Sequence, residues 1–210
     1  MSKSSYNSRP KYILIPLFGM GLFVVLYILA SLNYPGGSWN DVNHKGFSFW
    51  NNYLCDLLDK YAINGALNSG RYYARAALGV LCLSLLFLWL NLHKLVTESI
   101  NTKIMTYSGV LALLTTFFLA SNTHDIIVRI SGVFGVVAIL SLTVEQFKMH
   151  YIKLGLLGVT CIVIFLINYY VYETGFYLKC LPIIQKFTFA AFMVWFSILN
   201  AMLYCKSDKV

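Results

Sequence analysis

Six long apolar stretches recur along the chain, and they limit its fold more than any other feature of the sequence. A helix needs roughly 20 mainly apolar residues to cross a bilayer, because each residue adds about 1.5 Å and the hydrocarbon core is roughly 30 Å thick. We therefore predict an all-α fold, a polytopic membrane helix bundle in a single integral-membrane domain over residues 1–210. The six expected transmembrane helices cover residues 12–32, 72–92, 104–120, 125–144, 152–172 and 181–204.

The composition supports this prediction and excludes several classes of protein. Of the 210 residues, 59% are hydrophobic and 11% are charged, whereas about a quarter of an average soluble domain is charged. A soluble fold of this size has too little interior to bury so much apolar surface. A secreted disulfide scaffold, a disordered tail and an ordinary cytosolic enzyme are thereby excluded.

The first apolar stretch resembles a signal peptide in one respect, since Lys3, Arg9 and Lys11 precede it. Its apolar core is longer than the roughly 7–15 residues of a signal peptide, and no small-residue cleavage site follows it. We expect this stretch to be retained as a transmembrane helix.

The distribution of Lys and Arg predicts the orientation in the membrane. With the N-terminus inside, the inner segments hold nine of these residues and the outer segments hold four. Inner segments favour Lys and Arg, so we expect both termini in the cytoplasm and the protein in the bacterial inner membrane. The net charge of +8 then reflects topology and the anionic lipid bilayer. No nucleic-acid partner is expected, because no basic stripe is interleaved with aromatic residues.

Residues 33–70 form the external segment, which is the one sizeable piece between the expected spans. It opens with a turn signal at residues 34–37, and further turn signals at residues 64–65 and 68–70 lead into the second span. Between them, apolar residues recur at helical spacing from Phe47 to Tyr61, which predicts an amphipathic helix. Its polar face would carry Asn51, Asn52, Asp56 and Asp59.

Ionisable residues within or near the expected spans all fall in the outer half of the membrane. A charge at mid-membrane costs roughly 2.5–3.5 kcal/mol, so each of these residues needs a partner or a function. Arg71 and Arg75 are four residues apart and share one helix face, and Asp125 and Arg129 have the spacing of an ion pair. The full set is Arg71, Arg75, His124, Asp125, Arg129, Glu173 and Lys186.

These residues predict an outward-facing polar cavity, capped by the amphipathic helix, that binds and in one reading processes an anionic lipid or small molecule. Arg and Lys groups suit a phosphate or carboxylate, and His124 supplies a group that titrates near neutral pH. The expected ligand-binding residues are Asn51, Asn52, Arg71, Arg75, Arg129 and Lys186. The expected catalytic residues are Asp56, His124 and Asp125.

Other functions stay open at this point. The polar groups are also typical of interfacial anchors in a non-enzymatic membrane subunit or a partner-binding protein, and buried ionisable groups occur in proton or small-solute transporters. Whether the protein is an enzyme is left open. If it is one, the position of the cavity indicates a membrane-embedded hydrolase or transferase acting at the outer leaflet.

No metal or other cofactor is expected, since the histidines lack the spacing of a metal-binding motif. A divalent metal held by His44, His124 and a carboxylate is the alternative. Cys55 and Cys180 both fall on the outer side, where an oxidising compartment permits a disulfide between them.

Several short blocks resemble a bacterial family of uncharacterised multi-pass membrane proteins, classed as a domain of unknown function. The blocks are Tyr-Pro-Gly-Gly at 34–37, Asn-Tyr-Leu-Cys-Asp-Leu-Leu at 52–58, Asn-Gly at 64–65, an Asn-x-x-Arg element at 68–71 and Thr-His-Asp at 123–125. The likeness is clearest from Tyr34 to Leu90, and the last third of the chain carries no matching motif. The resemblance implies the membrane fold and the choice of site residues, and it implies no particular activity.

A thiol reagent that does not cross membranes tests the predicted orientation. We expect it to label Cys55 or Cys180 if these thiols are free, and to spare Cys205, which follows the last span on the cytoplasmic side. Mass spectrometry of the labelled protein reads the result. Labelling of Cys205 alone would overturn the orientation and the site built on it.

Overall fold

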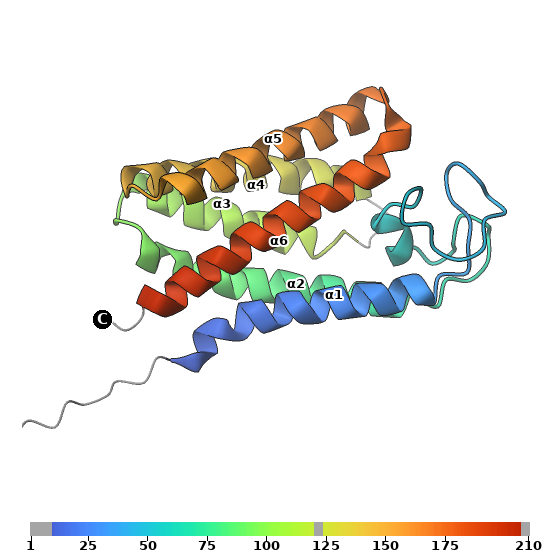
Figure 1. Ribbon diagram of the computed structural model, residues 1–210, viewed down its shortest axis with the longest axis horizontal. Coiled ribbons are helices and arrows are strands. Elements are labelled where there is room, and N and C mark those ends of the chain that lie inside the picture. The colour runs from blue at the N-terminus through green and yellow to red at the C-terminus, as the bar shows by residue number, and fades with distance from the viewer. Residues whose placement is uncertain (1–9, 120–123, 207–210) are drawn as a thin grey trace, which may run out of the picture.

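The computed structural model describes residues 10–119 and 124–206, and within these ranges the regular structure is helical, with no extended strand (Figure 1). The six α-helices are α1 (Ile15–Leu32), α2 (Arg71–Asn91), α3 (Ile100–Thr116), α4 (His124–Lys148), α5 (Ile152–Thr174) and α6 (Leu181–Lys206). Short 3₁₀ helices lie at Lys11–Leu14, Cys55–Leu58, Leu92–Leu95 and Leu178–Cys180. The predicted all-α bundle is confirmed.

Successive helices run in alternating directions, so both described ends of the chain lie at one end of the bundle and the external segment lies at the other (Figure 1). Helices α1 and α2 pack as one pair and α3 and α4 as another. Helix α6 crosses the bundle obliquely in front of them. At the end near the termini, Asn200 Nδ2 donates to the carbonyl oxygen of Ile13 at 2.7 Å, which ties α6 to the start of the chain.

The outer surface of the bundle is apolar. Large apolar side chains face outward along the helices, such as Phe18, which is 75% exposed on α1, and Val133, which is 65% exposed on α4. A soluble monomer rarely exposes contiguous apolar patches of this extent. Five helical segments are long and apolar enough to cross a membrane, namely Lys11–Leu32, Arg71–Leu95, His124–Lys148, Ile152–Thr174 and Leu178–Lys206. The length and apolar surface of these helices therefore support the prediction that this is a membrane protein.

Helix α3 is the one that differs most from its expected span. It begins and ends four residues earlier than predicted, and the last residue of that predicted span, residue 120, lies outside the described ranges. With 17 residues, α3 is about 25 Å long, somewhat shorter than the roughly 30 Å hydrocarbon core. Its terminal turn continues as far as residue 119.

The predicted amphipathic helix over residues 47–61 is wrong. The segment contains only the 3₁₀ helix at Cys55–Leu58, because side-chain oxygens take the backbone N–H groups that an α-helix would use. Asn52 Oδ1 accepts from the Ser48 N–H at 2.8 Å, and Asp56 Oδ2 accepts from the Tyr53 N–H at 2.9 Å. The burial does not follow two helix faces. Of the residues expected on the polar face, Asn52 and Asp56 are buried and Asp59 is exposed. Of the apolar residues, Leu57 and Leu58 are buried while Trp50 is 62% exposed.

Asn68 holds the external segment together from the inside. Its side chain is completely buried, and its Nδ2 donates to the carbonyl oxygens of Leu57 at 3.1 Å and Asp59 at 3.0 Å. The Leu57 carbonyl lies in the 3₁₀ helix near its end, and the Asp59 carbonyl follows that helix. Leu57 and Leu58 then pack against Ala74 and Leu78 of α2, which fixes the segment on top of the bundle.

We expect Asn68→Ala to destabilise the external segment by roughly 1–3 kcal/mol, because it leaves buried carbonyl groups without a donor. Asn51→Ala is the matched control, since Asn51 is partly exposed and its side chain bonds only to Ser48 and Asn40. Thermal unfolding and limited proteolysis of the segment measure the difference. Equal stability of the two variants would contradict the role assigned to Asn68.

Candidate functional site

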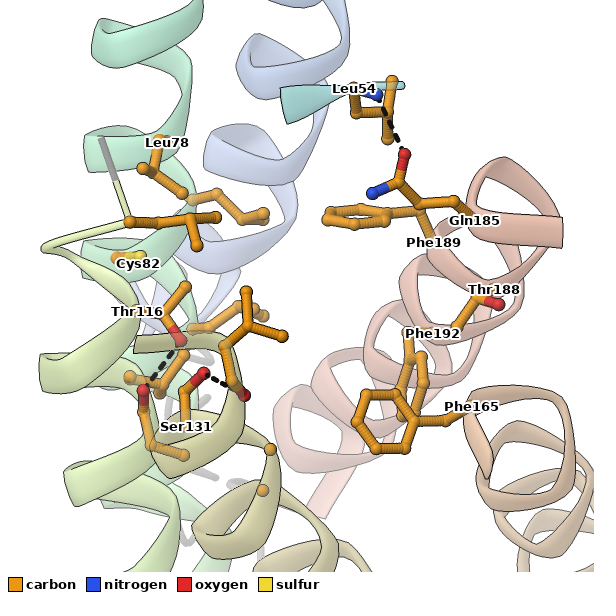
Figure 2. A pocket seen from close by; sticks show the side chains of 18 of the residues that line it. Leu54, Leu78, Cys82, Thr116, Ser131, Phe165, Gln185, Thr188, Phe189 and Phe192 are labelled. Carbon is orange, nitrogen blue, oxygen red and sulfur yellow. Dashed lines mark hydrogen bonds between the residues drawn. The ribbon is translucent and has the colours of Figure 1, made fainter. Parts of the chain in front are cut away.

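A cavity of about 340 Å³ lies inside the bundle beneath the external segment. All six helices contribute to its wall, and Leu54 and Cys55 of the external segment form its roof. Figure 2 shows α6 on one side, with Phe189 and Phe192 directed across the space toward Leu78, Thr116 and Ser131. The volume falls within the roughly 300–1,000 Å³ of small-molecule sites.

The face of helix α6 that borders the cavity changes from polar to apolar along the helix. The lining positions recur at helical spacing, so they lie along one stripe of the helix. The stripe begins near the roof with the polar residues Gln185 and Thr188 and continues with apolar side chains deeper in. The deeper residues of this stripe are Phe189, Phe192, Met193 and Phe196.

Gln185 joins α6 to the roof. Its Oε1 accepts from the Leu54 N–H at 2.9 Å, and the hydroxyl of Tyr27 on α1 donates to the Leu54 carbonyl at 3.5 Å. Both polar groups of the Leu54 backbone are thus bonded to the bundle. In Figure 2 the Gln185 oxygen is turned to Leu54, and its Nε2 lies 3.8 Å from Cys55 Sγ.

This cavity is not lined by the ionisable residues that the sequence predicts for a polar cavity. Among the described residues that line the cavity, none is Lys, Arg, His, Asp or Glu. The predicted site residues lie elsewhere, in two separate clusters. The first cluster belongs to the external segment and its supports, and comprises Asn51, Asn52, Asp56, Arg71, Arg75 and Lys186. The second lies at the outer ends of α4 and α5, and comprises His124, Asp125 and Arg129.

The cations of the first cluster bind backbone carbonyl groups. Arg71 donates to the carbonyl of Lys60 at 3.2 Å, and Arg75 donates to that of Leu58 at 3.0 Å. Lys186 donates to the carbonyl of Asn52 at 2.6 Å, and its ammonium lies 5.1 Å from the centre of a phenyl ring. These contacts attach the external segment to α2 and α6, because they neutralise carbonyl oxygens that point toward the helices.

Asp56 and Asn52 form the polar centre of the same cluster. Asn52 Nδ2 donates to Asp56 Oδ2 at 3.0 Å and to the Gly37 carbonyl at 2.9 Å. Burial raises the pKa of Asp56, and hydrogen bonds from Asn52, the Tyr53 N–H and Trp39 oppose that rise. Asn51 lies at the rim, bonded to Ser48 and Asn40. The arrangement orders a loop around a partly desolvated carboxylate.

The second cluster corrects one predicted ion pair. Arg129 pairs in a two-pronged contact with Glu173 on α5, with Nε–Oε1 at 2.9 Å and Nη2–Oε2 at 3.2 Å. Its predicted partner Asp125 instead accepts from the hydroxyl of Tyr172 at 2.6 Å and lies 3.1 Å from His124 Nδ1. A cross-helix fork is available to Arg129 only because α5 packs beside α4, and a fork binds carboxylate better than a single contact.

The two clusters approach each other at Asp59. Burial raises the pKa of Asp59, and the nearby groups of His124 and Arg75 oppose the rise.

The described residues contain no group of three or more His, Cys, Asp or Glu side chains that could hold a metal ion. All five cysteines are free, so the Cys55–Cys180 disulfide is not formed.

Three polar residues of the cavity were missed in the sequence. Gln185, Thr188 and Asn168 line its wall, and Asn168 Nδ2 donates to Thr188 Oγ1 at 3.4 Å. The helical spacing of Gln185 and Thr188 with Phe189 and Phe192 was visible in the sequence, so that signal could have placed them on one face. Nothing in the sequence indicated that this face borders a cavity.

No protein family, curated protein or solved structure matches the chain. The resemblance to the bacterial membrane-protein family therefore stays an expectation. What the chain does has to be argued from its cavity and from its two polar clusters.

The raised pKa of Asp56 predicts a pH dependence of stability. The folded state binds this proton more tightly than the unfolded state, so the stabilisation is complete below the ordinary pKa of 3.8 and is lost as pH rises through the raised value. We expect Asp56 to lower the melting temperature as pH rises above 3.8 through this raised pKa, and Asp56→Asn to remove that contribution. Asp41→Asn, at an exposed carboxylate of the same segment, should leave it unchanged. A slope that Asp56→Asn does not alter would refute the prediction.

Proposed function

We propose that the protein is a six-span inner-membrane protein, with both termini in the cytoplasm, that binds a lipid-like molecule in the cavity beneath its external segment. The observation that carries this proposal is the cavity itself, about 340 Å³ in volume, lined by residues of all six helices and by Leu54 and Cys55 of the external segment. Its lining is mostly apolar with a few polar groups, which is typical of ligand sites.

The arrangement of the helices supports the topology. An even number of alternating helices brings the chain back to its starting side, and the described ends lie together (Figure 1). The external segment at the opposite end then faces the periplasm. In this proposal α3, which packs against α4 and α2, is the sixth span.

The cavity is better suited to binding than to chemistry. A nucleophile needs a base within hydrogen-bond reach, and the described lining residues include no carboxylate or imidazole. Burial raises the pKa of the Cys55 thiol to about 12, so this group stays protonated and unreactive. The lining hydroxyls of Thr116 and Ser131 donate to carbonyl groups of their own helices. The lining also offers no cation for the anionic group that the sequence suggested.

A glycine on α4 allows the cavity to be filled without disturbing the fold. Gly135 lines the cavity, and an added Cβ there meets no atom within 4 Å. We expect Gly135→Leu to fold, since leucine is a better helix former than glycine, and to lose bound lipid because its side chain occupies the space. Native mass spectrometry of the gently purified protein measures the lipid that stays bound.

Gly21→Leu is the matched control for this variant. Gly21 lies on α1, is exposed, and also has no atom within 4 Å of an added Cβ. It should retain the same lipid as the wild type. Equal retention in both leucine variants, or a wild-type protein that carries no lipid-like molecule, would contradict the proposed function.

A further inference from the structure

We infer that the ligand of the cavity is an uncharged long-chain ester, held with its carbonyl oxygen at Gln185 near the roof and its chain directed along α6 toward Phe196. This inference rests on the proposed function and goes further by naming the class of ligand. It follows from the order of groups along the cavity wall, from the hydrogen bonds of Gln185 and from the bonds that hold the Leu54 backbone to α6 and α1.

The Gln185 amide has a donor left over for a ligand. Its oxygen is occupied by the Leu54 N–H at 2.9 Å, which fixes the orientation of the amide and turns Nε2 away from Leu54. Nε2 contacts Cys55 Sγ at 3.8 Å, and a thiol sulfur is only a weak acceptor. A carbonyl oxygen placed at this end of the cavity would give the N–H group a strong acceptor in an apolar surrounding, where such a bond is worth most.

The wall beyond Gln185 matches a hydrocarbon chain. Phe189 stacks on Phe23 of α1 with ring centres 6.1 Å apart, and Phe192 stacks on Phe196 at 5.8 Å. From Gln185 to Phe196 the helix advances by three turns, or about 16 Å. A molecule that is polar at one end and apolar along its length therefore matches the wall in one orientation, with its polar end at Gln185 and its apolar chain toward Phe196.

The roof and the lining together favour a neutral molecule over a charged one. No Lys or Arg is among the described lining residues, so a buried carboxylate or phosphate would lack a counter-charge and would pay the full desolvation cost. A headgroup above the roof is also disfavoured. The backbone of Leu54 is bonded to α6 and α1, and Lys186 bonds the carbonyl of Asn52 to α6 at 2.6 Å.

The fluorescence of two tryptophans reports where the hydrocarbon chain of the ligand lies. Trp89 and Trp195 both flank Phe196, with ring centres 6.1 and 5.6 Å away, while Trp39 and Trp50 lie in the external segment. Bromine quenches indole fluorescence at contact range. Three probes of equal chain length, each brominated at the chain end, are titrated into the purified protein: the methyl ester, the alkane and the carboxylate.

We expect all quenching by the ester to come from the buried tryptophans, and the ester to bind roughly 3- to 10-fold more tightly than the alkane, as one net hydrogen bond allows. Gln185→Leu should bring this ratio close to one. Because it also removes the acceptor of the Leu54 N–H, the ester and the alkane are compared within the same variant. Asn168→Leu is the matched control, since it removes an amide from the same wall without touching the roof, and it should keep the ratio.

The outcomes separate this inference from the proposed function. Equal binding of ester and alkane by the wild type, tighter binding of the carboxylate, or loss of the ester preference in Asn168→Leu alone would overturn the ester assignment. The cavity would then still be a binding site if Gly135→Leu weakens every probe. If no probe quenches the wild-type protein, the proposed function fails as well. The wild-type comparison needs no variant, so the inference stays testable even if Gln185→Leu does not fold.

Discussion

The structure depends on how the irregular external segment satisfies its backbone polar groups at the edge of the membrane. A chain that leaves the helical state there has no ladder of its own, and buried N–H and carbonyl groups without partners are costly. Buried amides supply the partners: Asn52 bonds the Ser48 N–H and the Gly37 carbonyl, and Asn68 bonds two carbonyl groups at the end of the 3₁₀ helix and just after it. Lys186 adds a bond from α6. Together with the packing of Leu57 and Leu58 against α2, these bonds hold the segment on the bundle.

This attachment has a consequence for the interior. Because Arg71, Arg75 and Lys186 are committed to carbonyl groups, and Arg129 to Glu173, the charges near the outer surface are used outside the cavity. The space beneath the roof is then bordered by aromatic and aliphatic groups with a few amides and hydroxyls. A cavity of this kind selects for apolar volume and for one well-placed hydrogen bond, not for charge.

The external segment shows where the sequence pattern misled. Apolar residues from Phe47 to Tyr61 have helical spacing, but Asn52 and Asp56 offer the backbone competing hydrogen bonds, so a compact loop forms in place of a helix. These two side chains were expected on the polar face of that helix, directed to a ligand, and they bond the loop's own backbone in place of one. The spacing of apolar residues predicts a helix face, but it does not predict that a polar side chain will bond the backbone and replace the helix by a loop.

The sequence by itself determined the all-α membrane bundle and the approximate position of each helix. The reason is that the length of an apolar stretch is a local property, and this length decides whether a helix can cross a bilayer. It also placed the ionisable residues of the predicted site near the ends of the expected helices. Only the tertiary structure decided their partners, as with Arg129 and Glu173, which are 44 positions apart, and only it placed Gln185 beside Leu54 across 131 positions. Partners and cavities arise from helices that meet in space, and no local pattern encodes where six apolar helices leave a gap.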